Sequence, residues 1–145
     1  MATIRFDHVG ITVGDLDTVT GFFVGLGLEL EGRTVLEGEF LDTVIGVPGS
    51  RTEVVVLRPP GGGPGLELSR FLRPDAEPGP PDPPPNELGL RNVTFEVADL
   101  HAVLDRLAAD GHHPVGGVGQ FEGSWRMASV RGPEGILVDL AQRLG

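Results

Sequence analysis

The chain contains no cysteine, no lysine and no tyrosine. The lack of cysteine excludes disulfide bonds, thiolate nucleophiles and zinc sites built on thiolates. The lack of lysine and tyrosine excludes Schiff-base lysine chemistry and phenolic acid–base catalysis. No stretch approaches the roughly 18 consecutive apolar residues of a membrane-spanning helix, and the N-terminus lacks the apolar run of a signal peptide. We therefore expect a cytoplasmic protein with no membrane partner.

Basic residues are also scarce. The sequence has 11 basic residues, all of them arginine, against 21 acidic residues, which gives a net charge of -10 at pH 7. Such a surface repels phosphate backbones, so a nucleic-acid partner is not expected. The 145 residues suffice for one globular domain that buries about 70% of its unfolded surface. A small molecule is the partner class that this composition leaves open.

The sequence repeats itself once. Residues 6–16 align with residues 90–100 when the chain is shifted by 84 positions. Six residues then fall on identical ones, namely Val9 on Val93, Val13 on Val97, Asp15 on Asp99, Leu16 on Leu100, Val19 on Val103 and Gly27 on Gly111. Two copies predict a pair of similar modules rather than a solenoid.

Each copy begins with a predicted strand followed by a helix. Residues 4–13 alternate in the manner of a strand, and Asp15 and Gly27 are suited to begin and end a helix over 16–26. Further strands are predicted over 28–36, 51–58 and 66–71, with 37–45 left open between a turn and a short helix. The second copy predicts a strand over 90–97, a helix from Asp99 to Asp110, and strands over 115–121, 125–130 and 135–141.

A proline-rich segment separates the copies. Residues 73–88 contain seven prolines, which is incompatible with the interior of a sheet or helix. A ligand for a polyproline-binding domain is one interpretation, and a spacer between modules is the one that we adopt. The sequence thus divides into a first βαβββ module (1–72), a linker (73–88) and a second βαβββ module (89–145), together an α+β domain.

Four polar side chains occupy matching places in the two modules. His8 and Asn92 lie on the first strands, on the face opposite the one that meets the helix, and Glu67 and Asp139 lie between large aliphatic residues on the last strands. If the first and last strands of each module are neighbours, all four side chains face one cavity. Taken singly, His8 is more simply interpreted as a hydrogen-bonded strand histidine, and the two acids as part of a solvated strand face.

The sequence resembles the vicinal oxygen chelate superfamily, which includes glyoxalase I, bleomycin-resistance proteins and ring-cleaving dioxygenases. The resemblance is carried by residues 6–16, 65–68, 92–100 and 132–140. It implies a curved mixed sheet around a cavity, and a homodimer. It also implies a metal site in which His8 and Glu67 are the first and second ligands. Asn92 stands where relatives most often have histidine, and Asp139 where they usually have glutamate.

The resemblance implies two functions. The first is a lyase or isomerase in which a divalent ion (Mn, Mg, Fe, Co, Ni or Zn) stabilises an enediolate or similar oxyanion, while Glu67 or Asp139 moves the proton. The second is a metal-free protein of the bleomycin-resistance type that sequesters a drug or metabolite. A metal-free enzyme is a third possibility, and Asn92 argues against the two-histidine triad of ring-cleaving dioxygenases.

Further residues are candidates for substrate binding, namely Thr12, Ser69, Asn92, Trp125 and Arg126. Trp125 offers a ring for stacking, although filling the core is an equal alternative. Arg126 offers a guanidinium for an anionic group, although a surface position is the simpler interpretation. The adjacent His112 and His113 lack evident partners for a metal.

Overall fold

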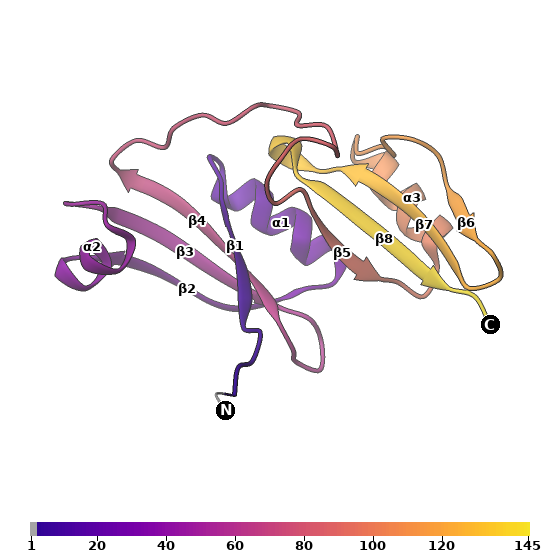
Figure 1. Cartoon of the computed structure of the whole chain (residues 1–145), viewed down its shortest axis with the longest axis horizontal. Helices are drawn as coiled ribbons and strands as arrows, with labels where there is room; N and C mark the ends of the chain where they lie inside the picture. Colours follow the sequence, from indigo (N-terminus) through magenta and orange to yellow (C-terminus); the bar gives the residue numbers. More distant parts are fainter. Residues whose placement is uncertain (1–2) are drawn as a thin grey trace. The chain divides into compact units, whose positions relative to one another are not determined.

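The computed structural model describes residues 3–145. The chain forms two compact units, unit 1 ending at Pro78 and unit 2 spanning Gly79–Gly145. Each unit contains one four-stranded mixed sheet (Figure 1). The α+β class expected from the sequence is confirmed, with a separate sheet in each unit. Within residues 3–145, no helix combines the length and the apolar character needed to cross a membrane.

Unit 1 has the strand order β1-β4-β3-β2. Its elements are β1 (His8–Thr12), α1 (Leu16–Leu26), β2 (Glu29–Glu37), α2 (Glu39–Ile45), β3 (Arg51–Arg58) and β4 (Gly65–Arg73). β1 pairs with β4 in parallel, and the other pairs are antiparallel. The segment that the sequence left open between turn and helix contains α2.

The helix α1 covers one face of the first sheet. Its N-cap Asp15 accepts a hydrogen bond from the backbone N–H of Thr18 at 3.0 Å, and Gly27 ends the helix with a φ of 122°. The helix buries Leu16, Val19 and Phe23, and packs against β3 and β4. The other helix of this unit, α2, contacts the edge strand β2.

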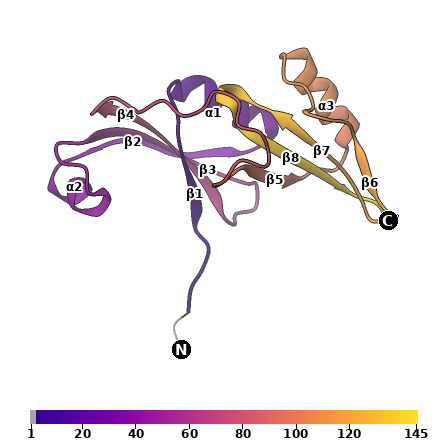
Figure 2. The same cartoon turned by 45° about the horizontal axis from the view of Figure 1, so that its top comes forward.

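Unit 2 repeats this plan. Its elements are β5 (Asn92–Glu96), α3 (Leu100–Ala109), β6 (Gly119–Phe121), β7 (Trp125–Arg131), the 3-10 turn η1 (Pro133–Gly135) and β8 (Leu137–Arg143). The strand order is β5-β8-β7-β6, with β5 and β8 parallel. Both views show α3 on one side of this sheet (Figure 2). The strand expected over 115–121 is shorter than predicted, because Gly116 and Gly117 contribute no side chain to a sheet.

Part of the proline-rich segment packs on unit 2. The guanidinium of Arg131 donates hydrogen bonds to the carbonyls of Pro83 at 2.6 Å and Gly135 at 3.2 Å. A Cβ on Gly135 would lie 2.0 Å from the carbonyl oxygen of Pro81. Residues 79–88 therefore lie against the turn between β7 and β8.

A carboxylate fixes the loop after α2, and its titration gives a testable pH dependence. Asp42 accepts hydrogen bonds from the backbone N–H groups of Gly49 (2.9 Å) and Ser50 (3.0 Å) and from the Ser50 hydroxyl (2.8 Å). These donors, the Gly49 N–H first, lower the pKa of Asp42 below its ordinary value of 3.8. The charged carboxylate therefore stabilises the folded state above pH 3.8, and this contribution is lost as the pH falls through the lowered pKa.

We expect Asp42→Asn to lower the free energy of unfolding at pH 7, with the difference from wild type shrinking below pH 3.8. Urea unfolding at a series of pH values measures this difference. Asp105→Asn, at an exposed position of α3, is the control and should change stability little at any pH. An Asp42→Asn difference that stays constant from pH 7 to pH 2 would contradict the assigned role.

Candidate functional site

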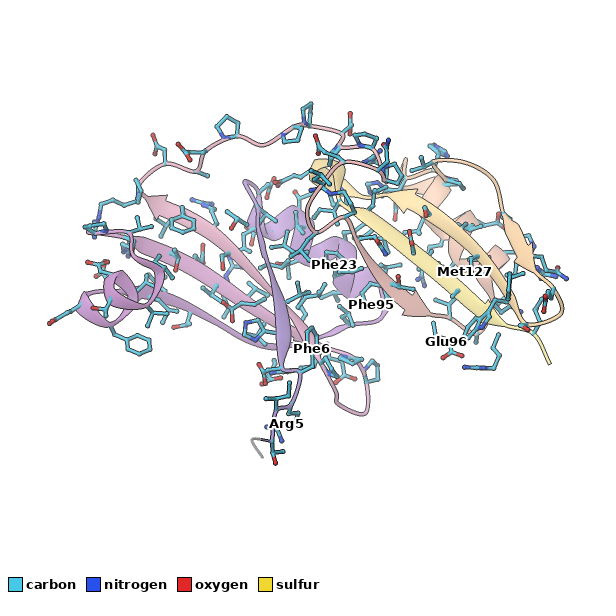
Figure 3. The ribbon with its side chains drawn as sticks, in the orientation of Figure 1. Arg5, Phe6, Phe23, Phe95, Glu96 and Met127 are labelled. Atoms are coloured by element: carbon cyan, nitrogen blue, oxygen red, sulfur yellow. The ribbon has the colours of Figure 1, made fainter. Side chains whose placement is uncertain are left out.

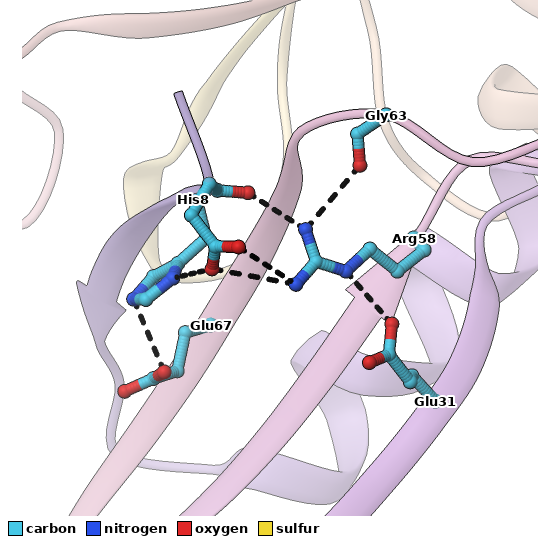
Figure 4. A network of polar contacts seen from close by, with 6 residues as sticks. His8, Glu31, Arg58, Gly63 and Glu67 are labelled. Carbon is cyan, nitrogen blue, oxygen red and sulfur yellow. Dashed lines mark hydrogen bonds and ion pairs between the residues drawn. The ribbon is translucent and has the colours of Figure 1, made fainter. Parts of the chain in front are cut away.

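In unit 1, β1 and β4 bring His8 and Glu67 together. The parallel register pairs His8 with Gly65 and Gly10 with Glu67, so the side chains of His8 and Glu67 project from the same face. The distance from His8 Nε2 to Glu67 Oε2 is 3.1 Å (Figure 4). The side chains are 36% and 31% exposed, so solvent or a ligand reaches both.

The neighbours of Glu67 in β4 explain why it occupies this face. Leu66 and Leu68 are buried on the side of the sheet that carries α1. Alternation along the strand then directs Glu67 to the opposite side. Gly65 is required beside His8, because a Cβ there would lie 2.2 Å from the carbonyl oxygen of Leu57.

The second ring nitrogen of His8 also meets a carboxylate. His8 Nδ1 lies 2.7 Å from Asp7 Oδ2, and Asp7 in turn lies 3.3 Å from the Nη2 atom of Arg58. The hydrogen bond with His8, followed by the charge of Arg58, lowers the pKa of Asp7. A carboxylate on Nδ1 leaves Nε2 as the ring atom that faces Glu67.

In unit 2 the corresponding pair is Asn92 and Asp139, which make more hydrogen bonds than His8 and Glu67 do. Thr94 pairs with Asp139 in the register of β5 and β8, as Gly10 pairs with Glu67 in unit 1. Asn92 Nδ2 donates to Asp139 Oδ2 at 3.1 Å and contacts the Thr94 hydroxyl at 3.0 Å. The Ser129 hydroxyl donates to Asp139 Oδ1 at 2.5 Å. Both carboxylate oxygens of Asp139 thus accept hydrogen bonds.

The other candidate residues lie at different places. Thr12 and Ser69 pair with each other across β1 and β4, on the same face as Glu67. Trp125 shares a face with Asp139 and lies under the guanidinium of Arg143, whose carbon is 4.3 Å from the ring centroid. Arg126 alternates to the opposite face of β7 from Trp125, so the structure does not bring it to Asp139.

Met127 and Glu96 extend the open face of unit 2 (Figure 3). Both pair with Ala141 of β8 and therefore share the face of Asp139. The Met127 side chain is 38% exposed and Phe121, on the adjacent β6, is 65% exposed. This face thus offers an apolar surface beside the hydrogen-bonded Asp139.

A cavity of about 730 Å³ opens at one end of the first sheet. Its walls include Phe6, Leu30, Arg58 and the glycine-rich turn 61–63, and also Arg5, which Figure 3 labels together with Phe6. Neither His8 nor Glu67 lines it. The cavity therefore lies beside the His8–Glu67 pair and is distinct from it.

Sequence reasoning missed Asp7, Arg58 and Ser129. Alternation assigned Asp7 to the face opposite His8, but β1 begins at His8, so Asp7 precedes the strand and its side chain reaches the neighbouring ring. The pairing of Ser129 with Asp139 follows only from the register of β7 and β8. The sequence feature that could have indicated Asp7 is its position directly before the candidate histidine His8.

Two copies of a βαβββ unit, each with one four-stranded mixed sheet, define a duplicated α+β protein of the glyoxalase type. The sequence matches the family described as Glyoxalase/Bleomycin resistance protein/Dioxygenase superfamily over residues 5–140. The chain belongs to this superfamily, as its resemblance to the vicinal oxygen chelate proteins predicted. Among curated proteins, none matches the sequence significantly.

Solved structures support the same conclusion. A glyoxalase family protein from Bacillus cereus is 40% identical, with a TM-score of 0.96 over 100% of this chain and 97% of that chain. TnmS3, an antibiotic-binding protein from Streptomyces sp. CB03234, is 22% identical, with a TM-score of 0.65 over 99% of this chain and 98% of that chain. A glyoxylase/bleomycin resistance protein/dioxygenase domain from Frankia sp. EAN1pec is 18% identical, with a TM-score of 0.65 over 99% and 98%. The last two show the shared fold alone.

The metal-dependent function among those that the resemblance implies needs a divalent ion, and His8 and Glu67 of unit 1 offer donors that fit one. A metal-binding histidine commonly donates its second ring N–H to a carboxylate, as His8 does toward Asp7. In unit 2, Asp139 offers carboxylate oxygens, while Asn92 turns its amide nitrogen toward them. Within residues 3–145, no three His, Asp or Glu side chains are gathered in the way of a complete metal site.

Proposed function

We propose that the protein is a metal-dependent small-molecule enzyme, a lyase or an isomerase, in which His8 and Glu67 hold a divalent cation. The observation that carries the proposal is the 3.1 Å separation of His8 Nε2 and Glu67 Oε2, with Asp7 on the other ring nitrogen. Two adjacent ligand atoms at about 2.1 Å from an octahedral ion lie about 3.0 Å apart. The pair is therefore spaced as neighbouring ligands would be.

Asp139 and Asn92 are proposed as the corresponding candidate ligands of unit 2. Asp139 would contribute a carboxylate oxygen, and Asn92 would contribute its amide oxygen after a rotation of the amide group. Imidazole and oxygen donors of these kinds suit Mn²⁺, Mg²⁺, Fe²⁺ or Co²⁺, and also admit Ni²⁺ and Zn²⁺.

Within this proposal the two acids have different roles. A bound cation supplies Lewis-acid stabilisation of negative charge on a substrate oxygen. Glu67, once released from the cation, would accept the proton from the substrate carbon, because among residues 3–145 its side chain has a polar contact with His8 alone and can turn toward a substrate. Asp139 is held by Ser129 and Asn92 and is less free to do so.

Other residues are proposed to bind the substrate. The hydroxyl groups of Thr12 and Ser69 lie together on the face of Glu67, where they can donate to substrate oxygens. Trp125 and Asn92 are the candidates for substrate binding in unit 2. Arg126 is the weakest member of this set, because it alternates away from the face of Asp139.

Metal content tests the proposal. Protein purified without a chelator or a metal-affinity tag should contain close to one equivalent of divalent metal by elemental analysis, or bind one equivalent of Mn²⁺ or Co²⁺ when titrated. At a concentration 100 times the Kd, the ion should stabilise the fold by about 2.7 kcal/mol, which raises the Tm by roughly 5–10 °C. Substoichiometric metal together with an unchanged Tm across Mn²⁺, Co²⁺, Ni²⁺ and Zn²⁺ would refute it.

A metal-free binding protein is the second candidate, and a specific observation favours it. Asn92 and Ser129 already satisfy both oxygens of Asp139. The net charge of -10 would suit a cationic small molecule. TnmS3, which shares the fold, is an antibiotic-binding protein. Protein that binds no metal but gives a saturable calorimetric titration with a cationic antibiotic would favour this candidate.

Two further expectations from the sequence belong to the proposal, a cytoplasmic location and a homodimeric state. A sedimentation velocity experiment that gives twice the 15.3 kDa mass of the chain would support the dimer. A sedimenting species of 15.3 kDa at micromolar concentration would contradict it.

A further inference from the structure

Arg58 lies at the end of β3 and is bound on several sides. Its Nε donates to Glu31 Oε2 at 2.7 Å, and its Nη1 donates to the carbonyl oxygens of Asp7 at 2.7 Å and Gly63 at 3.3 Å. Its Nη2 meets the two Asp7 carboxylate oxygens at 3.4 and 3.3 Å. The guanidinium thus links β2, the turn after β3 and the residue that precedes β1 (Figure 4).

Asp7 connects this guanidinium to His8. The Asp7 side chain is 59% exposed and contacts Arg58 and the Nδ1 atom of His8. An exposed aspartate without a cation beside it would sample several rotamers. With Arg58 on both its carboxylate and its backbone carbonyl, Asp7 is held in the position that meets the imidazole.

We propose that Asp7 and Arg58 are positioning residues, which hold the His8 imidazole with Nε2 directed at Glu67. This inference rests on the proposed function, because it assigns His8 the role of a ligand. The argument is one of preorganisation. A ligand side chain that is already oriented loses less rotational freedom when the ion binds, and residues behind a ligand typically change metal affinity by about 10–100-fold.

Arg33 provides a matched control. Like Arg58, it joins two carboxylates in unit 1, with Nη1 2.7 Å from Asp17 and Nε 2.9 Å from Glu53. Neither of these acids contacts a histidine among the described residues. Substitution of Arg33 therefore removes a similar ion-pair cluster without changing the surroundings of His8.

The test compares Arg58→Gln with Arg33→Gln, and Asp7→Ala with Asp17→Ala. The first measurement is the ¹⁵N–¹H imidazole spectrum of the metal-free protein, with the His8 signal assigned through His8→Gln. We expect a protected His8 Nδ1–H in wild type and in both controls, and its loss in Asp7→Ala and Arg58→Gln. Arg58→Lys should restore part of the signal, since a lysine can still reach one acid.

The second measurement is the affinity for Mn²⁺. Asp7→Ala should weaken binding about 10–100-fold and Arg58→Gln about 10-fold, while the controls change it less than about 2-fold. An unchanged His8 signal in Asp7→Ala would overturn the positioning role, and so would equal metal affinities in test and control variants. If wild type binds no metal, the proposed function fails, while the spectrum still decides whether Asp7 and Arg58 orient His8. If Arg58→Gln does not fold, Asp7→Ala carries the test.

Discussion

Replacing either His8 or Glu67 with glutamine is expected to lower the affinity for Mn²⁺ by more than about 100-fold. A residue behind a ligand typically contributes about 10–100-fold, and loss of the ligand itself should cost more. Glutamine keeps much of the bulk of both side chains, and both positions are about one-third exposed, so the fold should be retained. Isothermal titration calorimetry and the Mn²⁺ electron paramagnetic resonance signal measure the loss.

His101→Gln and Glu39→Gln are the controls for this pair of substitutions. Both residues are exposed, on α3 and α2 respectively, and neither belongs to the proposed site. The His8/Glu67 double variant should bind little more weakly than the worse single variant, because residues that share one ion are not independent. Retention of wild-type affinity in either single variant would show that the two side chains do not share an ion. Additive losses in the double variant would point to two separate ions.

The sheet faces on which His8 and Glu67 lie could be predicted from the sequence because alternation is a strong constraint, whereas the pairing of β1 with β4 was a condition of that prediction. Side chains along a strand point alternately to its two faces, so the position of a residue in the strand fixes the face on which it lies. The repeat then located Asn92 and Asp139 at matching positions, which the parallel register of β5 and β8 reproduces. Resemblance to the superfamily added the chemistry, which alternation alone does not contain.

The surroundings of these pairs could not be predicted in the same way. Arg58 lies 51 positions from Asp7 in the sequence, and their contact depends on β4 pairing with both β1 and β3. The short helix α2 was ambiguous because Gly38 at its N-cap offers no capping side chain. Residues 73–88 were expected to act as a spacer, and no local pattern indicates that Pro81 and Pro83 lie against Gly135.

Gly135→Ala should destabilise unit 2 strongly. Gly135 has a φ of 76°, a conformation that disfavours any Cβ, and the added Cβ would lie 2.0 Å from the carbonyl oxygen of Pro81 and 3.3 Å from Pro83 Cδ. A contact this short forces the backbone of the proline-rich segment to move. That movement also stretches the hydrogen bond from Arg131 to Pro83. We expect a loss of about 3–4 kcal/mol, of which the backbone conformation accounts for about 1–2 kcal/mol.

Gly111→Ala separates the two contributions to this loss. Gly111 has a φ of 89°, but an added Cβ there would meet no atom within 4 Å. It should therefore show the conformational cost alone, about 1–2 kcal/mol in urea unfolding. Gly117→Ala, with neither a positive φ nor a close contact, should be nearly neutral. Equal losses for Gly135→Ala and Gly111→Ala would mean that the proline-rich segment leaves the turn at little cost. A clearly larger loss for Gly135→Ala would mean that residues 79–88 contribute to the stability of unit 2, because only that variant displaces them.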